Sequence, residues 1–253
     1  MKWRLVEINE HSAAMNMAID HAIYESVANK RENPTIRFYR WKDNSVSIGA
    51  YQNHRELNLE FCRKSGIDVV RRMTGGRAVF HDKNDFTYSV TAPLKFFNFS
   101  ITKAYNDICY CIIDALNSLG IRAELRNRND IVVKGKKISG NAAKMLDKGV
   151  YMQHGTIVYD INPELNSKIM NVAEGLFCER AVSIKSLKRA SKIRVYNALK
   201  DSFTFNKNFK TEPLSDWEMM RALELAEKVY SNIALPSNII VKNKGACYVE
   251  GLD

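Results

Sequence analysis

Two arginines lead into a paired-glycine loop in the segment RRMTGGRAVFHD, residues 71–82. Paired glycines let a backbone approach a ligand closely, because no Cβ stands in the way. Backbone N–H groups in such a loop can hold an anion, and Arg71 and Arg72 would add charge-assisted donors for phosphate or carboxylate. A plain β-hairpin with a glycine-rich turn is the alternative for the glycines alone. The spaced Gly-Lys-Ser/Thr ending of a Walker A loop is missing, so this is not a P-loop.

A second polar cluster lies in residues 127–143, NRNDIVVKGKKISGNAA. Lysines at a hairpin tip are normally solvated, and that is the alternative for the three lysines around Gly135. Lys137 differs because it leads directly into the strand start Ile-Ser-Gly, where its ammonium can point inward at an anion. Downstream, QHGT at 153–156 sets a histidine beside a hydroxyl, although a lone histidine is usually a core or turn residue.

Hydrophobic periodicity and turn residues predict the elements that carry these segments. The expected helices are 12–28 capped by Ser12, 55–65 stopped by Gly66, 100–119 between Ser100 and Gly120, and segments near 163–172, 186–200 and 213–230. The expected strands are 35–41 paired with 45–50 across a 42–44 turn, 67–72, two strands flanking His81-Asp82, and a meander over 121–160.

The 253 residues, 45% of them hydrophobic, suit one large domain with a substantial core. No long apolar run or signal peptide is visible, so a cytoplasmic protein without membrane association is expected. The net charge of +10 favours anionic partners. The basic residues within 185–194 predict a solvated helix face or, alternatively, a surface that docks an acidic partner. The five cysteines show no CxxC spacing, and Cys109 and Cys111 fit a helix core better than a metal site.

The two polar segments and QHGTIVYD, from residue 153, occur in the order found in the lipoate–protein ligase A family, which this chain resembles. The resemblance includes NMAID in the first predicted helix and SVSIGAYQN from residue 45, and it covers residues 1 to about 230. That family belongs to the wider group of biotin and lipoate protein ligases and octanoyltransferases. The resemblance implies an α/β (α+β) fold of mixed β-sheets flanked by helices. It implies one catalytic domain over residues 1–253, helical from about residue 162.

The activity implied by the resemblance is an ATP-dependent lipoate–protein ligase. Lipoate attacks the α-phosphate of ATP to give lipoyl-AMP. A lysine of an acidic lipoyl carrier domain then takes the acyl group as an amide. The carrier would be a 2-oxoacid dehydrogenase E2 or a glycine cleavage H protein. Mg²⁺ is expected with ATP because phosphate charge must be neutralised, but no ligands for it are predicted.

Lys137 is the catalytic residue that the resemblance implies, because its ammonium would lie against the carboxyl–phosphate junction and offset the negative charge that grows there in both steps. The implied nucleotide-binding residues are Arg71, Arg72, Thr74, Gly75, Gly76, Arg77, Ala78, Val79, Phe80, His81, Asp82, Asn129, Asp130, Lys137, His154 and Thr156. The implied lipoyl-binding residues are Ile19, Asp20, Trp41, Gly76, Ser139, Gly140 and His154.

Two departures from the family pattern bear on the activity. Arg77 replaces the usual third glycine of the loop, as it does in octanoyltransferases, which transfer acyl groups without ATP through a cysteine nucleophile. In octanoyltransferases with this loop the cysteine precedes the lysine hairpin, and residues 126–137 contain none. The ligase is therefore the favoured reading, with an octanoyl or lipoyl transferase as the alternative.

The second departure is the length of the C-terminus. Many ligases of this family carry an accessory domain there, and residues 236–253 are too few to replace it. A separate small accessory polypeptide is therefore predicted. A nucleic-acid-binding module is a third hypothesis, and we do not expect it, because the aromatic and basic interleaving of an RNA-binding sheet is missing.

Overall fold

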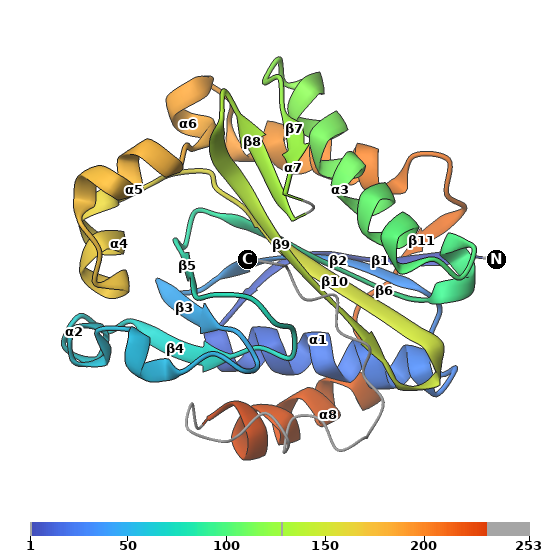
Figure 1. Ribbon diagram of the computed structural model, residues 1–253. Coiled ribbons are helices and arrows are strands. Elements are labelled where there is room, and N and C mark those ends of the chain that lie inside the picture. Colours follow the sequence, from blue (N-terminus) through green and yellow to red (C-terminus); the bar gives the residue numbers. More distant parts are fainter. Residues whose placement is uncertain (1, 128, 232–253) are drawn as a thin grey trace.

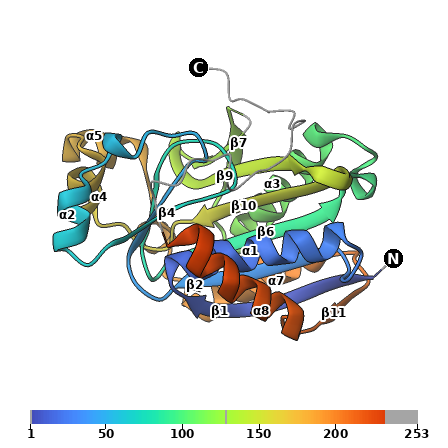
Figure 2. The same ribbon diagram turned by 90° about the horizontal axis from the view of Figure 1, so that it is seen from below.

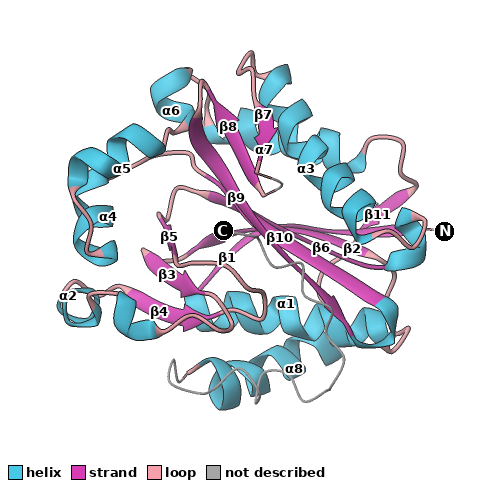
Figure 3. Cartoon of the chain, in the orientation of Figure 1, coloured by secondary structure: helices cyan, strands magenta, loops and turns pink. Residues whose placement is uncertain are grey.

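The computed structural model describes residues 2–127 and 129–231. An eight-stranded mixed sheet of order β11-β1-β2-β6-β10-β9-β8-β7 forms its centre, and a smaller sheet of order β4-β3-β5 stands beside it (Figure 1). Helices flank the large sheet (Figure 3). The predicted α/β (α+β) fold with mixed sheets flanked by helices is confirmed.

The strands are β1 (Trp3–His11), β2 (Thr35–Trp41), β3 (Ser45–Ile48), β4 (Asp68–Arg71), β5 (Val79–His81), β6 (Phe86–Pro93), β7 (Glu124–Arg126), β8 (Asp130–Val133), β9 (Lys136–Leu146), β10 (Val150–Ile157) and β11 (Phe209–Thr211). The α-helices are α1 (Ala13–Ala28), α2 (Leu59–Lys64), α3 (Ile101–Ser118), α4 (Pro163–Met170), α5 (Glu174–Arg180), α6 (Ile184–Leu187), α7 (Lys192–Thr204) and α8 (Asp216–Leu225). Short helical turns are η1 (His54–Glu56), η2 (Leu94–Phe97), η3 (Asp147–Gly149) and η4 (Ala226–Tyr230).

Two layers of helices cover the large sheet. α3 and α7 pack on one face, and α1 with α8 lies on the other (Figures 1 and 2). The α3 face holds the largest core cluster, in which Ile108 and Ile112 pack with Tyr88 and Tyr151 of the sheet. The α1 face holds a second core that includes Ile19 and Trp41. Each strand of the centre is therefore buried on both sides, and its two faces can serve different purposes.

Helix ends follow the local signals in the sequence. The Ser12 hydroxyl accepts a hydrogen bond from the Met15 N–H, and the Ser100 hydroxyl accepts one from the Lys103 N–H. Gly120, with φ of +79°, ends α3 in the left-handed conformation that glycine adopts readily. The predicted helices 12–28 and 100–119 and the meander over 121–160 are confirmed.

The predicted hairpin of 35–41 with 45–50 is wrong. β2 lies between β1, to which it is parallel, and β6, to which it is antiparallel, so both of its edges are occupied. β3 instead pairs with β4 and β5 in the small sheet. A three-residue turn that looked like a hairpin loop therefore carries the chain from one sheet to the other.

Other boundaries also changed. The predicted helix 186–200 is two helices, α6 and α7, because Ser183 and Ser191 each cap a new helix. β1 and β11 were not predicted. No helix within residues 2–127 and 129–231 combines the length and apolar character needed to cross a membrane. The predicted short tail 236–253, with Cys247, lies outside the described residues.

The first and the last described strands pair in the large sheet. β1 pairs in parallel with β11 through Trp3 and Phe209. Beside this pairing, the Arg4 guanidinium donates two hydrogen bonds of 2.7 and 2.6 Å to the Glu218 carboxylate, and both side chains are buried. The N-terminal strand is therefore fixed by residues more than 200 positions away.

Candidate active site

His154 and Thr156 are two positions apart in β10, so their side chains lie on the same face of the sheet, the α1 face. The His154 Nε2 atom lies 2.6 Å from the Thr74 hydroxyl in the glycine loop, and its Nδ1 atom lies 3.4 Å from the Asp20 carboxylate on α1. All three side chains are buried. This chain of contacts ties the glycine loop to the sheet and to the helix beneath it.

The Asp20 carboxylate accepts several further hydrogen bonds besides its contact with His154. It accepts hydrogen bonds from Arg37 at 2.7 Å, from the Tyr39 hydroxyl at 2.9 Å and from the Ser89 hydroxyl at 2.8 Å. Burial alone would raise its pKa, but the charges and hydrogen bonds of Arg37 and His154 outweigh burial and lower the pKa. Asp20 therefore stays ionised and fixes the orientation of His154.

A second branch of the network runs through His81 at the end of β5. Its ring nitrogens lie 2.8 Å from the Ser47 hydroxyl and 3.0 Å from the Thr156 hydroxyl, and its ring stacks on Trp41 at 4.0 Å between centroids. Burial, with the nearby positive charge of Arg72 second, holds the pKa of His81 well below 6.5. The ring is neutral at neutral pH, so it acts here as a rigid link between the two sheets.

The two arginines before the glycine loop donate hydrogen bonds to backbone carbonyl oxygens. Arg71 donates to the carbonyl oxygens of Gly49 and Gln52, each at 2.8 Å. Arg72 donates to the carbonyls of Gly75 and Arg77 at 2.6 and 2.9 Å. Both guanidinium groups are buried and shape the loop from behind. Their predicted direct contact with a nucleotide stays a prediction.

Gly49, at the end of β3, is the closest backbone neighbour of the glycine loop. A Cβ placed on it would lie 1.9 Å from the Gly76 carbonyl oxygen, whereas a Cβ on Gly75 would meet no atom within 4 Å. The loop thus rests against a bare backbone on one side and is open at Gly75.

We expect Gly49→Ala to displace the glycine loop and destabilise the protein by about 1–3 kcal/mol, because the clash is with backbone and cannot relax locally. Gly75→Ala is the matched control, since its methyl group has room in the free protein. Thermal unfolding of both variants measures the difference. Equal melting temperatures would contradict the packing described here.

Lys137 reaches the α1 face because of a β-bulge. The register between β8 and β9 shifts between Ser139 and Lys137, where an extra residue, Ile138, is inserted in β9. Such a shift turns a side chain to the other face. The Lys137 ammonium lies 3.0 Å from where a Cβ on Gly140 would stand, and Gly140 is paired with Thr156. Lys137 thus shares the face of His154 and Thr156, and its Nζ lies 2.6 Å from Asp130.

Some predicted site residues lie elsewhere. Ser139 pairs with Ile157, which belongs to the core on the α3 face, so Ser139 does not face the glycine loop. Phe80 packs in a separate core with Val46 and Ile48, on the other side of the strand from His81. Strand alternation explains both positions, because neighbours in sequence point to opposite faces. The ligand contacts predicted for Ser139 and Phe80 stay predictions.

The remaining predicted residues have simpler positions. Asn129 accepts a hydrogen bond from the Asn141 amide through its carbonyl oxygen, and Asp82 accepts from Asn84 in the turn after β5. Ala78 and Val79 are half-buried at the start of β5. Ile19 is fully buried in the α1 core. The ligand contacts predicted for all of them stay predictions.

Sequence analysis missed four polar residues that support this network: Arg37, Tyr39, Ser47 and Ser89. Each lies in a strand and is buried. One signal was available in the strand TIRFYRW, whose Arg37 occupies a position that alternation assigns to a buried face. A buried arginine needs a carboxylate partner, and Asp20 on the preceding helix supplies it at 2.7 Å.

Three cysteines have side chains that the structure describes, Cys62, Cys109 and Cys111, and they lie in the cores. Cys62 packs in the core of the small sheet. Cys109 and Cys111 belong to α3, and burial raises their pKa values to about 12 and about 11. A thiol must be deprotonated to act as a nucleophile, so these cysteines are poor candidates.

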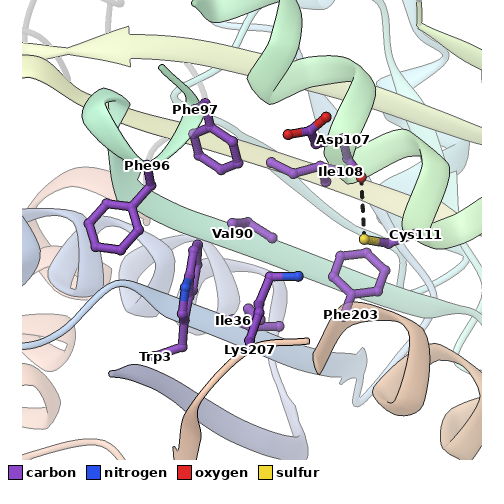
Figure 4. Close-up of a pocket in the computed structure, with 10 residues that line it drawn as sticks. All are labelled: Trp3, Ile36, Val90, Phe96, Phe97, Asp107, Ile108, Cys111, Phe203 and Lys207. Carbon is purple, nitrogen blue, oxygen red and sulfur yellow. Dashed lines mark hydrogen bonds between the residues drawn. The ribbon is translucent and has the colours of Figure 1, made fainter. Parts of the chain in front are cut away.

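A cavity of about 180 Å³ lies between the sheet and α3, on the face opposite His154 (Figure 4). Trp3, Ile36, Val90 and Phe97 line it, with Lys207 at its side.

Within the described residues, no three His, Cys, Asp or Glu side chains gather as a metal site. The predicted requirement for ATP and Mg²⁺ stays a prediction.

A family model for the lipoyl protein ligase A/B catalytic domain matches residues 12–207. This range contains the glycine loop, the β-bulge at Lys137 and the His154 network. The chain belongs to this family. The recognition of lipoate–protein ligase relatives from the sequence motifs is thereby confirmed.

Relatives with curated names are octanoyltransferases. The chain is 32% identical to an octanoyltransferase LipM of Clostridioides difficile (strain 630), over 91% of this chain and 97% of that protein. It is 31% identical to the octanoyltransferase LipM of Bacillus subtilis (strain 168), over 91% and 96%. The expectation of an ATP-dependent lipoate ligase is therefore wrong as the main reading, because near-full-length relatives carry the alternative activity.

Solved structures of the lipoyl protein ligase A/B family confirm the fold. A lipoate-protein ligase A bound with ATP superposes with a TM-score of 0.81 at 30% identity, covering 92% of this chain and 97% of that one. A chain from the structural analysis of a bi-partite lipoate protein ligase and its E2 lipoyl domain from Thermoplasma acidophilum superposes with a TM-score of 0.84 at 28% identity, covering 96% of this chain and 99% of that one. The fold thus serves ligases and octanoyltransferases alike, and the residues at the site must decide between them.

Proposed function

We propose that this chain is an acyltransferase of the lipoyl protein ligase A/B family, which moves an octanoyl or lipoyl group onto a lysine of a lipoyl carrier domain without ATP. The observation that supports it most strongly is the near-full-length similarity to the octanoyltransferases LipM. The arginines committed to loop carbonyls are compatible with it, because an acyl thioester brings no phosphate for them to bind at the reacting carbonyl.

Lys137 is the electrostatic group of this proposal. Its ammonium lies on the α1 face beside Gly140, where no side chain on that residue blocks a carbonyl. There it would stabilise the oxyanion that forms when a nucleophile attacks the acyl carbonyl. Asp130, at 2.6 Å, holds the ammonium in place.

Cys178 is the nucleophile we propose. Its backbone lies in α5, and three residues later Ala181 forms a parallel bridge with Lys137. The Val182 N–H then donates to the Lys137 carbonyl at 2.9 Å. Of the four cysteines within α2, α3 and α5, this is the one whose chain continues into the segment beside Lys137.

The proposed reaction has two balanced steps. The Cys178 thiolate attacks the thioester carbonyl of an acyl donor, a new C–S bond forms, and the donor thiolate leaves and takes up a proton. The amine of the acceptor lysine then attacks the enzyme thioester, the amide bond forms, and the Cys178 thiol is regenerated by the proton that the amine loses.

The deciding experiment incubates the purified chain with an octanoyl thioester of acyl carrier protein and an apo E2 lipoyl domain, without nucleotide. We expect octanoylated lipoyl domain, detected by intact mass, and no increase when ATP and Mg²⁺ are added. Transfer that appears only with free octanoate, ATP and Mg²⁺ would overturn the proposal. A separate accessory polypeptide and a cytoplasmic location stay predictions for this chain, and the bi-partite organisation of one solved relative is compatible with the first.

A further inference from the structure

Residues 185–194, KSLKRASKIR, contain five basic residues and no acidic one. Lys185, Lys188, Arg189 and Arg194 are exposed, and Lys192 is half-buried. We call these five side chains the basic patch. Ile193 stands among them with 64% of its surface exposed. The patch therefore combines a concentrated positive charge with one apolar contact point.

The patch begins close to the proposed reaction centre. β10 pairs with β9 only as far as Ser139. At Lys137 the neighbouring backbone is that of Ala181 and Val182 instead. The Lys185 N–H donates to the Tyr159 carbonyl at 3.0 Å, so the chain still follows the end of β10 when it enters the patch. Lys185 comes three positions after Val182, a span of at most about 11 Å. A protein bound to the patch could therefore place a lysine side chain at Lys137.

Neighbouring charges leave the patch positive. Lys185 pairs with Asp160 at 2.5 Å, on an exposed surface where such a pair contributes little. Around Lys192 the positive groups are Arg40 and Lys83, and the negative groups are Asp82 and Glu10. Glu10 is itself paired with Arg40 at 2.9 Å. Lys188, Arg189 and Arg194 add three further charges that these acids do not offset.

We propose that the basic patch is the docking surface for the lipoyl carrier domain, through an acidic face of the carrier that surrounds its acceptor lysine. This inference rests on the proposed function. Complementary charge would speed the encounter and set the orientation of the carrier. Ile193 would supply the apolar centre of the contact, since small interfaces depend on a few desolvated residues.

A nucleic acid is the other polyanion that such a patch could attract. Residues 185–194 contain no aromatic residue on which a base could stack. The patch also begins three positions after Val182, whose N–H bonds the Lys137 carbonyl, and a protein lysine must arrive at Lys137 in the proposed reaction. Both observations favour an acidic protein domain.

The test compares the wild-type chain with Lys188→Glu/Arg189→Glu/Arg194→Glu, three exposed side chains outside the catalytic machinery. Lys64→Glu/Lys95→Glu/Lys228→Glu, on α2, η2 and η4, is the control with the same change in net charge. We expect the patch variant to raise the KM for apo E2 lipoyl domain at least about tenfold with little change in kcat, and the control to change neither. The wild-type KM should also rise steeply with salt.

A charge-swapped carrier gives a second measurement. This carrier is an apo lipoyl domain in which an acidic residue near the acceptor lysine is changed to Lys. It should bind the patch variant more tightly than it binds the wild-type chain. An unchanged KM in the patch variant, with active wild type, would overturn the docking surface and leave the acyltransferase standing. A wild-type chain that transfers nothing would overturn the proposed function itself. Binding of RNA that the patch variant loses, without any effect on the KM for the carrier, would assign the patch to nucleic acid.

Discussion

Replacing Lys137 with alanine should leave the fold intact and slow acyl transfer by about 10²–10³-fold, the usual loss when one oxyanion donor is removed. The side chain is 43% exposed and contributes little to the core, so the melting temperature should change little. The loss arises because no other described cation lies beside Gly140 on the α1 face. Single-turnover transfer of octanoate from its carrier thioester to an apo lipoyl domain measures it.

Two further variants sharpen this result. Lys136→Ala is the control at the adjacent position, which is exposed and precedes the bulge. Lys137→Arg should remain slow, because a planar guanidinium does not place its charge where the ammonium does. Near-normal transfer by Lys137→Ala would remove the central residue of the proposed mechanism.

Replacing Cys178 with serine should reduce transfer by at least about 10⁴-fold and abolish the acyl-enzyme, since a hydroxyl without a general base is a weak nucleophile. Acid-quenched enzyme mixed with the octanoyl donor should carry one octanoyl group in the wild type and none in the variant, as seen by intact mass.

Cys62→Ser and Cys111→Ala are the controls for the thiol, because both cysteines lie in cores away from Lys137. They should keep the acyl-enzyme as long as they fold. Full transfer by Cys178→Ser, with no thioester in either protein, would show that the acceptor lysine attacks the donor directly.

Local signals predicted the helices well and the sheet partners poorly. Ser12, Ser100 and Gly120 mark helix ends through contacts within a few residues, so the sequence contains what is needed. The partner of β2 depends on β1 and β6, and the partner of β3 depends on β4. Nothing in the turn between β2 and β3 distinguishes a hairpin from a change of sheet.

The site shows the same division. Motif order brought together Thr74, His81, Lys137 and His154, which the structure places around one face of β9 and β10. Their orientations were not predictable, since a single inserted residue, Ile138, decides which face Lys137 occupies. The activity was misassigned because residues 126–137 contain no cysteine, whereas the cysteine that we propose as the nucleophile, Cys178, comes 41 positions after Lys137 in the sequence.

The pairing of β1 with β11 and of Arg4 with Glu218 has a consequence for synthesis of the chain. The ribosome adds Glu218 to the growing chain 214 residues after Arg4. At about 5–20 residues per second, the interval is on the order of ten to forty seconds. During that time a cation destined for burial has no carboxylate partner, and one edge of β1 is unpaired. Until β11 and Glu218 have been synthesised, the large sheet of the nascent protein therefore has an open edge at β1.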